Sequence, residues 1–177
     1  CSRTKQPGSQ KCWTGHLPDE EQAEAAMSYQ AFVLKNATEL FRRLRCQNSN
    51  LAGTMPFTII FHNWDGVKSF AEMKPKPVAW QYQISYQPIL LSWENWQSQI
   101  YAGNKLSVVA HVVNDDDYFN DLTGAHLQWW IEKGDEKFLS GDIELPSVPY
   151  YGTYKKPLSI DIPQNLPSGD YKLKGEI

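Results

Sequence analysis

The chain has 177 residues, of which 41% are hydrophobic and 13% aromatic, and its formal net charge is −3. This composition predicts one globular domain or a pair of small ones and excludes a disordered chain. The mild negative charge argues against a nucleic-acid partner, which would need clustered lysine and arginine. No apolar run approaches the roughly 20 residues of a membrane-spanning helix.

Residues 1–16 are polar and predict a loop that holds two of the three cysteines, Cys1 and Cys12. Cys12 and Cys46 flank a predicted helix, so their backbones would lie too far apart for a disulfide, whereas a Cys1–Cys12 bridge stays open. The spacings match no zinc site, and we expect neither a metal nor another cofactor. Cys1 followed by Ser2 is similar to the mature start of a bacterial lipoprotein; a cleavage site or an arbitrary start is the alternative. A secreted or periplasmic bacterial protein, with a lipid anchor as one option, is therefore expected.

The stretch "LPDEEQAEAAMSYQAFVLKNATELFRRLR" predicts one helix from about Pro18 to Arg45. Asp19 with Gln22 resembles a capping box, and the first turn is acidic, as suits the positive end of a helix. An apolar stripe at spacings of three and four includes Met27, Leu34 and Phe41. We expect the stripe to pack against a core.

A short strand is predicted at "FTIIF", residues 57–61, because it is β-rich and apolar on both faces, as in a parallel sheet. With the preceding helix it makes one α/β unit. One such unit cannot bury its own faces, so the chain is expected to be a piece of something larger. The strand ends abruptly at four polar or aromatic residues: His62, Asn63, Trp64 and Asp65.

From Pro88 onward the pattern becomes β, after a short helix predicted to end near Tyr86. Six strands are predicted, in "PILLSW", "KLSVVAHVV", "AHLQWWIE", "KFLSGDIEL", "PLSIDIP" and "DYKLKGEI". The turn signals between them are Gly103-Asn104, Asn114–Asp117, Gly134-Asp135, Gly141-Asp142 and Ser168-Gly169. Strands at this spacing predict an antiparallel, immunoglobulin-like β-sandwich, without the cysteine bridge of antibody domains.

Two further patterns in this region are open to more than one interpretation. Trp129 and Trp130 must point to opposite faces of their strand, so one is expected in the core and the other at an interface or in an exposed patch. Asp115, Asp116 and Asp117 could be taken for a calcium site, but three successive carboxylates more often solvate a turn.

Four stretches in this order resemble the glycoside hydrolase family 2 enzymes, which include β-galactosidases, β-glucuronidases and β-mannosidases. They are "YQAFVLKNATELFRRLR", "FTIIFHNWDG", "MKPKPVAWQYQISYQPILLSWE" and "AHVVNDDDYFNDLTGAHLQWWI". They are similar to the family's late barrel helix, its last barrel strand, its exit from the barrel and the sandwich that follows. The resemblance covers nearly the whole chain. It implies that residues 1–86 are an α/β segment, the last αβ unit of a (β/α)8 barrel, and that residues 87–177 are an immunoglobulin-like sandwich.

The resemblance also implies a carbohydrate site, because barrel active sites lie at the carboxyl ends of the strands. Trp64 would stack on a sugar ring, and His62, Asn63 and Asp65 would bind its hydroxyl groups. The alternatives are a barrel-rim core position for Trp64, backbone capping by His62 and Asn63, and a simple turn at Asp65.

No catalytic residue is assigned to this chain. Retaining glycosidases use two carboxylates about 5 Å apart, and in this family both are glutamates on earlier barrel strands, which would precede Cys1. Glu72 and Glu94 do not correspond to them. The chain alone is therefore expected to hydrolyse nothing.

Two rival functions remain open: a non-catalytic carbohydrate-binding sandwich, and a structural domain that only supports a partner. The expected partners are carbohydrate and the remainder of the barrel. The apolar stripe of a lone αβ unit is also expected to drive homodimerisation or to pack on the sandwich.

Overall fold

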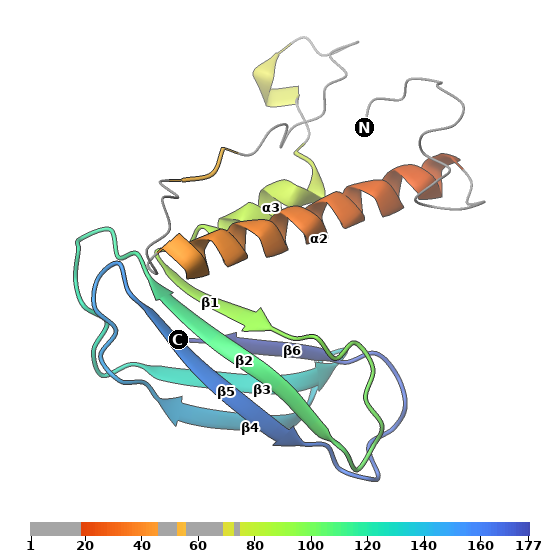
Figure 1. Cartoon of the computed structure of the whole chain (residues 1–177). Helices are drawn as coiled ribbons and strands as arrows, with labels where there is room; N and C mark the ends of the chain where they lie inside the picture. Colours follow the sequence, from red (N-terminus) through yellow and green to blue (C-terminus); the bar gives the residue numbers. More distant parts are fainter. Residues whose placement is uncertain (1–18, 46–52, 56–68, 73–74) are drawn as a thin grey trace. The chain divides into compact units, whose positions relative to one another are not determined.

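A computed structural model describes residues 19–45, 53–55, 69–72 and 75–177 of the chain (Figure 1). The chain divides into two compact units, Cys1–Tyr86 and Gln87–Ile177. Helices come first and antiparallel strands follow, which confirms the coarse prediction of a helical segment before an all-β region. The strand predicted at residues 57–61 lies outside the described residues, so the barrel assignment stays a prediction.

The first unit contains two α-helices, α2 (Asp19–Arg45) and α3 (Pro77–Ser85), and a short 3-10 helix, η1 (Phe70–Glu72). The last turn of α2 carries Arg42, Arg43 and Arg45, whose charge suits the negative end of the helix dipole. Pro77 opens α3, where its missing N–H leaves no hydrogen bond unmade and its fixed φ favours the helix. Among the described residues, neither α-helix combines the length and hydrophobicity that a membrane span requires.

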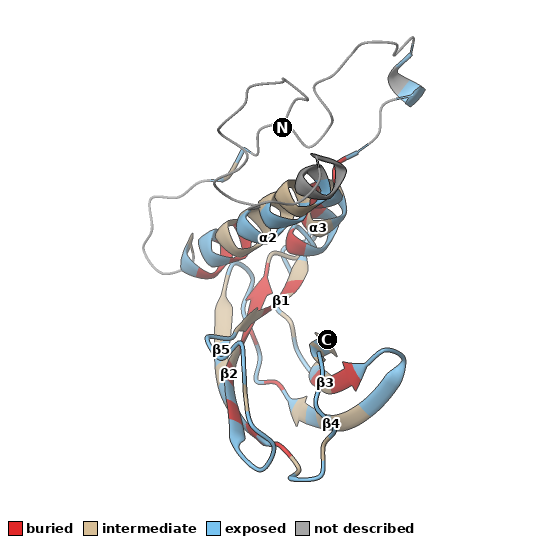
Figure 2. Cartoon of the chain, turned by 90° about the vertical axis from the view of Figure 1, so that its right-hand side faces the viewer, coloured by how far each residue is buried: buried red, intermediate tan, exposed pale blue. Residues whose placement is uncertain are grey.

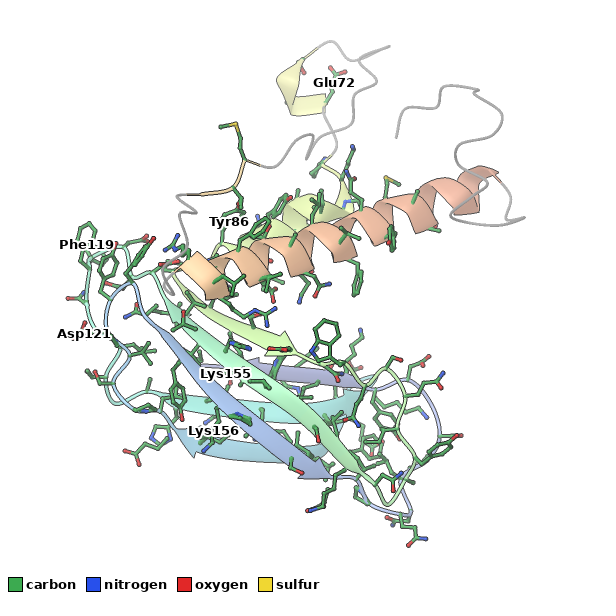
Figure 3. The ribbon with its side chains drawn as sticks, in the orientation of Figure 1. Glu72, Tyr86, Phe119, Asp121, Lys155 and Lys156 are labelled. Carbon is green, nitrogen blue, oxygen red and sulfur yellow. The ribbon has the colours of Figure 1, made fainter. Side chains whose placement is uncertain are left out.

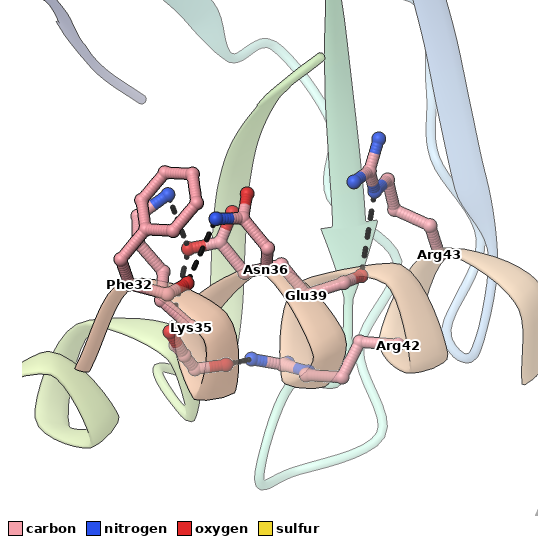
Figure 4. Close-up of polar contacts among 7 residues, drawn as sticks. Phe32, Lys35, Asn36, Glu39, Arg42 and Arg43 are labelled. Carbon is pink, nitrogen blue, oxygen red and sulfur yellow. Dashed lines mark hydrogen bonds and ion pairs between the residues drawn. The ribbon is translucent and has the colours of Figure 1, made fainter. Parts of the chain in front are cut away.

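Polar contacts join α2 to α3. Arg42 Nη1 donates to the carbonyl oxygen of Ser85 at 2.6 Å, and Ser85 Oγ donates to Glu39 Oε1 at 3.3 Å. Along α2 itself, Lys35 Nζ lies 3.1 Å from Glu39 Oε1, and Arg43 Nε donates to the Glu39 carbonyl oxygen at 3.4 Å (Figure 4). A carboxylate and two guanidinium groups thus occupy buried positions that apolar side chains usually fill.

The predicted apolar stripe of α2 is only partly buried. Met27 and Leu34 are half-buried, while Phe41 is 39% exposed. Other large apolar side chains of α2 are exposed as well: Tyr29, Phe32, Val33, Leu40 and Leu44. The expectation that the stripe packs in a core is therefore met only in part.

The second unit contains six strands in two sheets (Figure 1). The strands are β1 (Ile89–Glu94), β2 (Lys105–Asn114), β3 (His126–Lys133), β4 (Glu136–Glu144), β5 (Thr153–Asp161) and β6 (Lys172–Glu176). One sheet has the order β1-β2-β5 and the other β4-β3-β6, and every pairing is antiparallel. This order does not by itself identify immunoglobulin topology, so that finer expectation stays a prediction.

The core of the second unit lies between the two sheets. It forms two clusters: Leu106, Val108, Ile131, Ile160 and Ile162; and Ala110, Val112, Leu127, Leu145 and Val148. Each cluster joins alternate residues of β2 to residues of β3, as period-two alternation requires. Figure 2 shows the buried residues concentrated along β1, β2 and β3. The alternation in "KLSVVAHVV" predicts that Leu106, Val108, Ala110 and Val112 share one face of β2, and the two clusters confirm that this face is inward.

Trp129 packs against the core, as expected for one of the two indoles, whereas Trp130 lies on the opposite face of β3 and is half-buried. Trp129 pairs with Gly141 on β4 and Gly175 on β6. A Cβ at Gly141 would come within 2.5 Å of the Trp129 indole nitrogen. The prediction of a turn at Gly141-Asp142 is therefore wrong: both residues lie inside β4, and the glycine is there because the indole fills its side-chain space.

β5 begins at Thr153, four residues before the proline where a strand was predicted to start. Pro157 pairs with Val109 inside the strand. β5 is an edge strand, where a proline is tolerated because one side of the strand needs no donor.

Candidate functional site

The substrate-binding residues predicted from the sequence, His62, Asn63, Trp64 and Asp65, all lie outside the described residues. The three cysteines also lie outside them. The predicted sugar pocket therefore stays a prediction, and the candidate site below is built from residues that the structure describes.

Four aromatic side chains gather at one end of the sandwich: Tyr118, Phe119, Tyr150 and Tyr151, which we call the aromatic loop cluster. Tyr118 is 82% exposed and Phe119 70% exposed. The rings of Phe119 and Tyr150 meet edge to face, with centroids 5.0 Å apart and planes at 85°, and those of Tyr150 and Tyr151 are 6.1 Å apart. Figure 3 shows Phe119 and Asp121 in the loop at this end.

The cluster is built from the loop after β2 and the loop before β5, which an isolated β-bridge joins. Leu122 and Val148 exchange backbone hydrogen bonds of 2.9 Å in both directions. The backbone N–H of Asp115 donates to the carbonyl oxygen of Pro88 at 2.9 Å. The aromatic loop cluster therefore lies at the end where the chain enters the sandwich.

Asn114, the last residue of β2, holds the two loops together although none of its surface is exposed. Its side-chain amide donates to the carbonyl oxygens of Asn120 at 2.9 Å and Val148 at 3.0 Å, and its Oδ1 accepts from the Asp116 N–H at 3.1 Å. Its backbone carbonyl accepts from the Tyr151 N–H at 2.8 Å. A buried amide satisfied in this way fixes the loops on either side of it.

Two carboxylates fix the backbone that carries the rings. Asp116 Oδ2 accepts from the backbone N–H of Tyr118 at 3.0 Å and that of Asn120 at 3.1 Å. Asp121 Oδ1 accepts from the Tyr150 N–H at 2.8 Å, so it links one loop to the other. This is the role of the acidic run: Asp116 organises a turn, and no described group of His, Cys, Asp or Glu side chains is arranged to hold a metal ion.

Phe119 and Tyr151 have left-handed backbones, with φ of 63° and 61°. In the described residues they are the non-glycine positions where this occurs. A bulky side chain pays about 1–2 kcal/mol for this conformation. Such strain persists only where the surroundings impose it, and it concentrates at functional sites.

A second polar group lies on the outer face of the β4-β3-β6 sheet. His126 Nδ1 lies 2.7 Å from Asp142 Oδ1, and both side chains are about half exposed. The hydrogen bond to Asp142 raises the pKa of His126, and the same bond lowers the pKa of Asp142. These are ordinary surface interactions across paired strands.

The indole of Trp130, on the opposite face of β3 from Trp129, contacts Glu132 and Lys137. Its Nε1 donates to Glu132 Oε2 at 2.7 Å, and Lys137 Nζ lies 4.0 Å from the centre of its ring. Glu132 is also paired with Lys174 at 2.5 Å, and that hydrogen bond lowers the pKa of Glu132. A ring covered by a lysine offers less free surface than those of the aromatic loop cluster.

The first unit has a shallow groove of about 390 Å³ between α2 and α3. It is lined by Ser28, Ala31, Phe32 and Lys35 of α2 and by Pro77, Trp80, Gln81 and Ile84 of α3. Phe32 and Trp80 are 63% and 60% exposed. The groove presents an apolar surface with little polar functionality, which suits packing rather than chemistry.

No protein-family model matches the sequence, and no curated protein matches it. Sequence reasoning did not single out the aromatic loop cluster. The available signal was the placement of "YF" and "YY" among turn residues, in "DDDYFND" and "PYYG".

Proposed function

We propose that the chain is the C-terminal part of a retaining β-glycosidase of the β-galactosidase type, acting on carbohydrate outside the cytoplasm. The observation that carries the proposal is the order of the elements along the resembling stretches. In "MKPKPVAWQYQISYQPILLSWE", α3 starts at the second proline of the Pro-Lys-Pro turn, and β1 starts after the next proline. A two-sheet sandwich follows.

The exposed apolar face of α2 supports the idea of a larger protein. Helices of a (β/α)8 barrel bury such faces against strands and neighbouring helices. In the described part of the first unit the buried hydrophobic residues are Val78 and Tyr82 alone. The proposed partner for this face is the remainder of the barrel.

The proposal gives this chain a binding role and no catalytic one. Trp64 would stack on the sugar, with His62, Asn63 and Asp65 as hydrogen-bonding partners. Glu72 accepts from Ser69 Oγ at 3.2 Å on the surface, and Glu94 contacts His111 Nε2 at 2.8 Å and Trp96 Nε1 at 2.9 Å.

The test is the transcript sequence upstream of Cys1, followed by expression of the longer protein. We expect two glutamates at the ends of predicted barrel strands and hydrolysis of an aryl β-galactoside with retention of configuration. Replacing either glutamate by glutamine should abolish hydrolysis, and Trp64→Ala should raise KM more than it lowers kcat. An upstream sequence without such a pair would exclude the glycosidase.

A non-catalytic carbohydrate-binding module is the second candidate. The aromatic loop cluster favours it, because exposed rings beside fixed carboxylates need no reactive acid to hold a sugar.

A further inference from the structure

We propose that the aromatic loop cluster is a carbohydrate-binding surface of the sandwich, made of other residues than the pocket predicted at residues 62–65. The inference takes its ligand class, carbohydrate, from the proposed function. It does not require the chain to be part of a hydrolase.

The rings of the aromatic loop cluster offer an open apolar surface. Phe119 and Tyr150 meet edge to face, so the edge of one ring covers one face of the other, while Phe119 keeps 70% of its surface exposed. Phe119 and Tyr118 are among the most exposed aromatic side chains described. A pyranose ring has one face of C–H groups, which packs against such an open aromatic ring.

Aspartate side chains lie beside these rings. Asp116, Asp117 and Asp121 lie in the same loop as Phe119, and Asp116 and Asp121 are held in place by backbone N–H groups. Each accepts those bonds through one carboxylate oxygen, Oδ2 in Asp116 and Oδ1 in Asp121. Fixed carboxylates are strong acceptors for sugar hydroxyl groups. Protein-binding patches are also rich in aromatic residues, but they favour methionine and arginine and are depleted in aspartate, whereas these loops combine aromatic rings with aspartates.

The two loops that carry the aromatic loop cluster are already ordered without a ligand. Asn114 and the Leu122–Val148 bridge fix both loops before any ligand arrives. Phe119 is held in a left-handed backbone at a cost in strain, and its ring is exposed. A surface that is already ordered loses little conformational entropy on binding, which favours affinity for a small polar ligand.

The experiment is calorimetric titration of the 177-residue chain with galactose and mannose oligosaccharides. Phe119→Asn removes the ring but keeps a residue that tolerates positive φ, so folding should be retained. Tyr118→Ala removes the second ring. Tyr101→Ala is the matched control: Tyr101 is 83% exposed and precedes β2, at the opposite end of the strand from Asn114. Trp64→Ala tests the predicted pocket, and thermal unfolding confirms that each variant is folded.

We expect saturable binding that Phe119→Asn and Tyr118→Ala each weaken about tenfold or more, and that Tyr101→Ala leaves unchanged. Binding that survives both cluster variants would overturn the inference; if Trp64→Ala then abolishes it, the proposed pocket gains support instead. If neither sugar series binds, the inference is overturned. The glycosidase proposal would still be decided separately, by the sequence upstream of Cys1 and the hydrolysis assay. Self-association that the same two variants abolish would identify a protein-docking surface and would also overturn it.

Discussion

The two units of this chain are stabilised in opposite ways. In the sandwich, the buried positions between the sheets are aliphatic and continuous from β2 to β3. In the described part of the helical unit, buried positions are mostly polar or charged, while large apolar side chains stay exposed. The difference indicates that the sandwich carries its own aliphatic core, whereas the described helices combine polar buried positions with exposed apolar side chains.

The largest effect should come from the sandwich core. Leu127→Ala removes a side chain with no exposed surface, and we expect a loss of about 3 kcal/mol in the free energy of unfolding. Guanidinium unfolding followed by tryptophan fluorescence would measure it. Phe32→Ala, on the open face of α2, should cost less than about 0.5 kcal/mol. An equal cost at both sites would contradict the comparison, since it would mean that the face of α2 is covered in solution.

Polar contacts should matter most between the helices. Glu39→Ala leaves Lys35 and Ser85 Oγ without their carboxylate partner, and we expect a loss of about 2 kcal/mol. Helical circular dichroism during thermal unfolding is the readout. The control is Glu24→Ala, an exposed glutamate on the same helix, which should change little. A Glu39 variant as stable as the control would show that the buried charges do not hold α2 to α3.

The left-handed backbone at Phe119 predicts which of two variants at this position, alanine or glycine, is more stable. Phe119→Ala loses the contact with Tyr150 and keeps the unfavourable φ, whereas Phe119→Gly loses the contact and relieves the strain. We therefore expect the glycine variant to be more stable than the alanine variant by about 1 kcal/mol. Urea unfolding of the two variants decides it. The same pair at Tyr118, which has no positive φ, should show no advantage for glycine.

The smallest effect is a pH dependence at the sandwich surface. Because the pKa of His126 is raised, its pairing with Asp142 stabilises the fold fully below about pH 6.5. That stabilisation is lost as the pH rises through the raised pKa of His126. The lowered pKa of Asp142 means that its contribution is present above about pH 3.8 and is lost as pH falls through the lowered value. The His126–Asp142 pair should therefore stabilise the fold mainly between about pH 3.8 and about pH 6.5.

Titration of the His126 ring protons by NMR would test this. Asp142→Asn should return the pKa of His126 toward its ordinary value, because the hydrogen bond to Asp142 is the main cause of the shift. Glu144→Gln removes only a weaker charge effect and should change the pKa less. A larger shift in the Glu144 variant would show that the bond is not the cause.

Local signals in the sequence were sufficient for the elements themselves. The acidic first turn and the apolar stripe of α2 predicted its bounds to within a residue, and alternation predicted the inward face of β2. Hydrophobic period and helix-terminus charge both act over a few residues, so they can be recognised without knowing the fold.

The candidate site could not be predicted in the same way, because it depends on contacts distant in sequence. The bond from Asn114 to the Val148 carbonyl spans 34 positions. The left-handed backbone of Phe119 also contradicts the local preference of an aromatic residue. Gly141 was misinterpreted for a related reason: a glycine beside an aspartate signals a turn locally, and only the Trp129 indole across the sheet explains it.

The proline inside β5 has a consequence for how this chain behaves at high concentration. An outer strand with regular donors could recruit a strand from another molecule and extend the sheet indefinitely. Pro157 interrupts the donors of β5, and the charges of Lys155 and Lys156 on the same strand repel a second copy (Figure 3). The β5 edge is therefore expected not to recruit a second copy and extend its sheet.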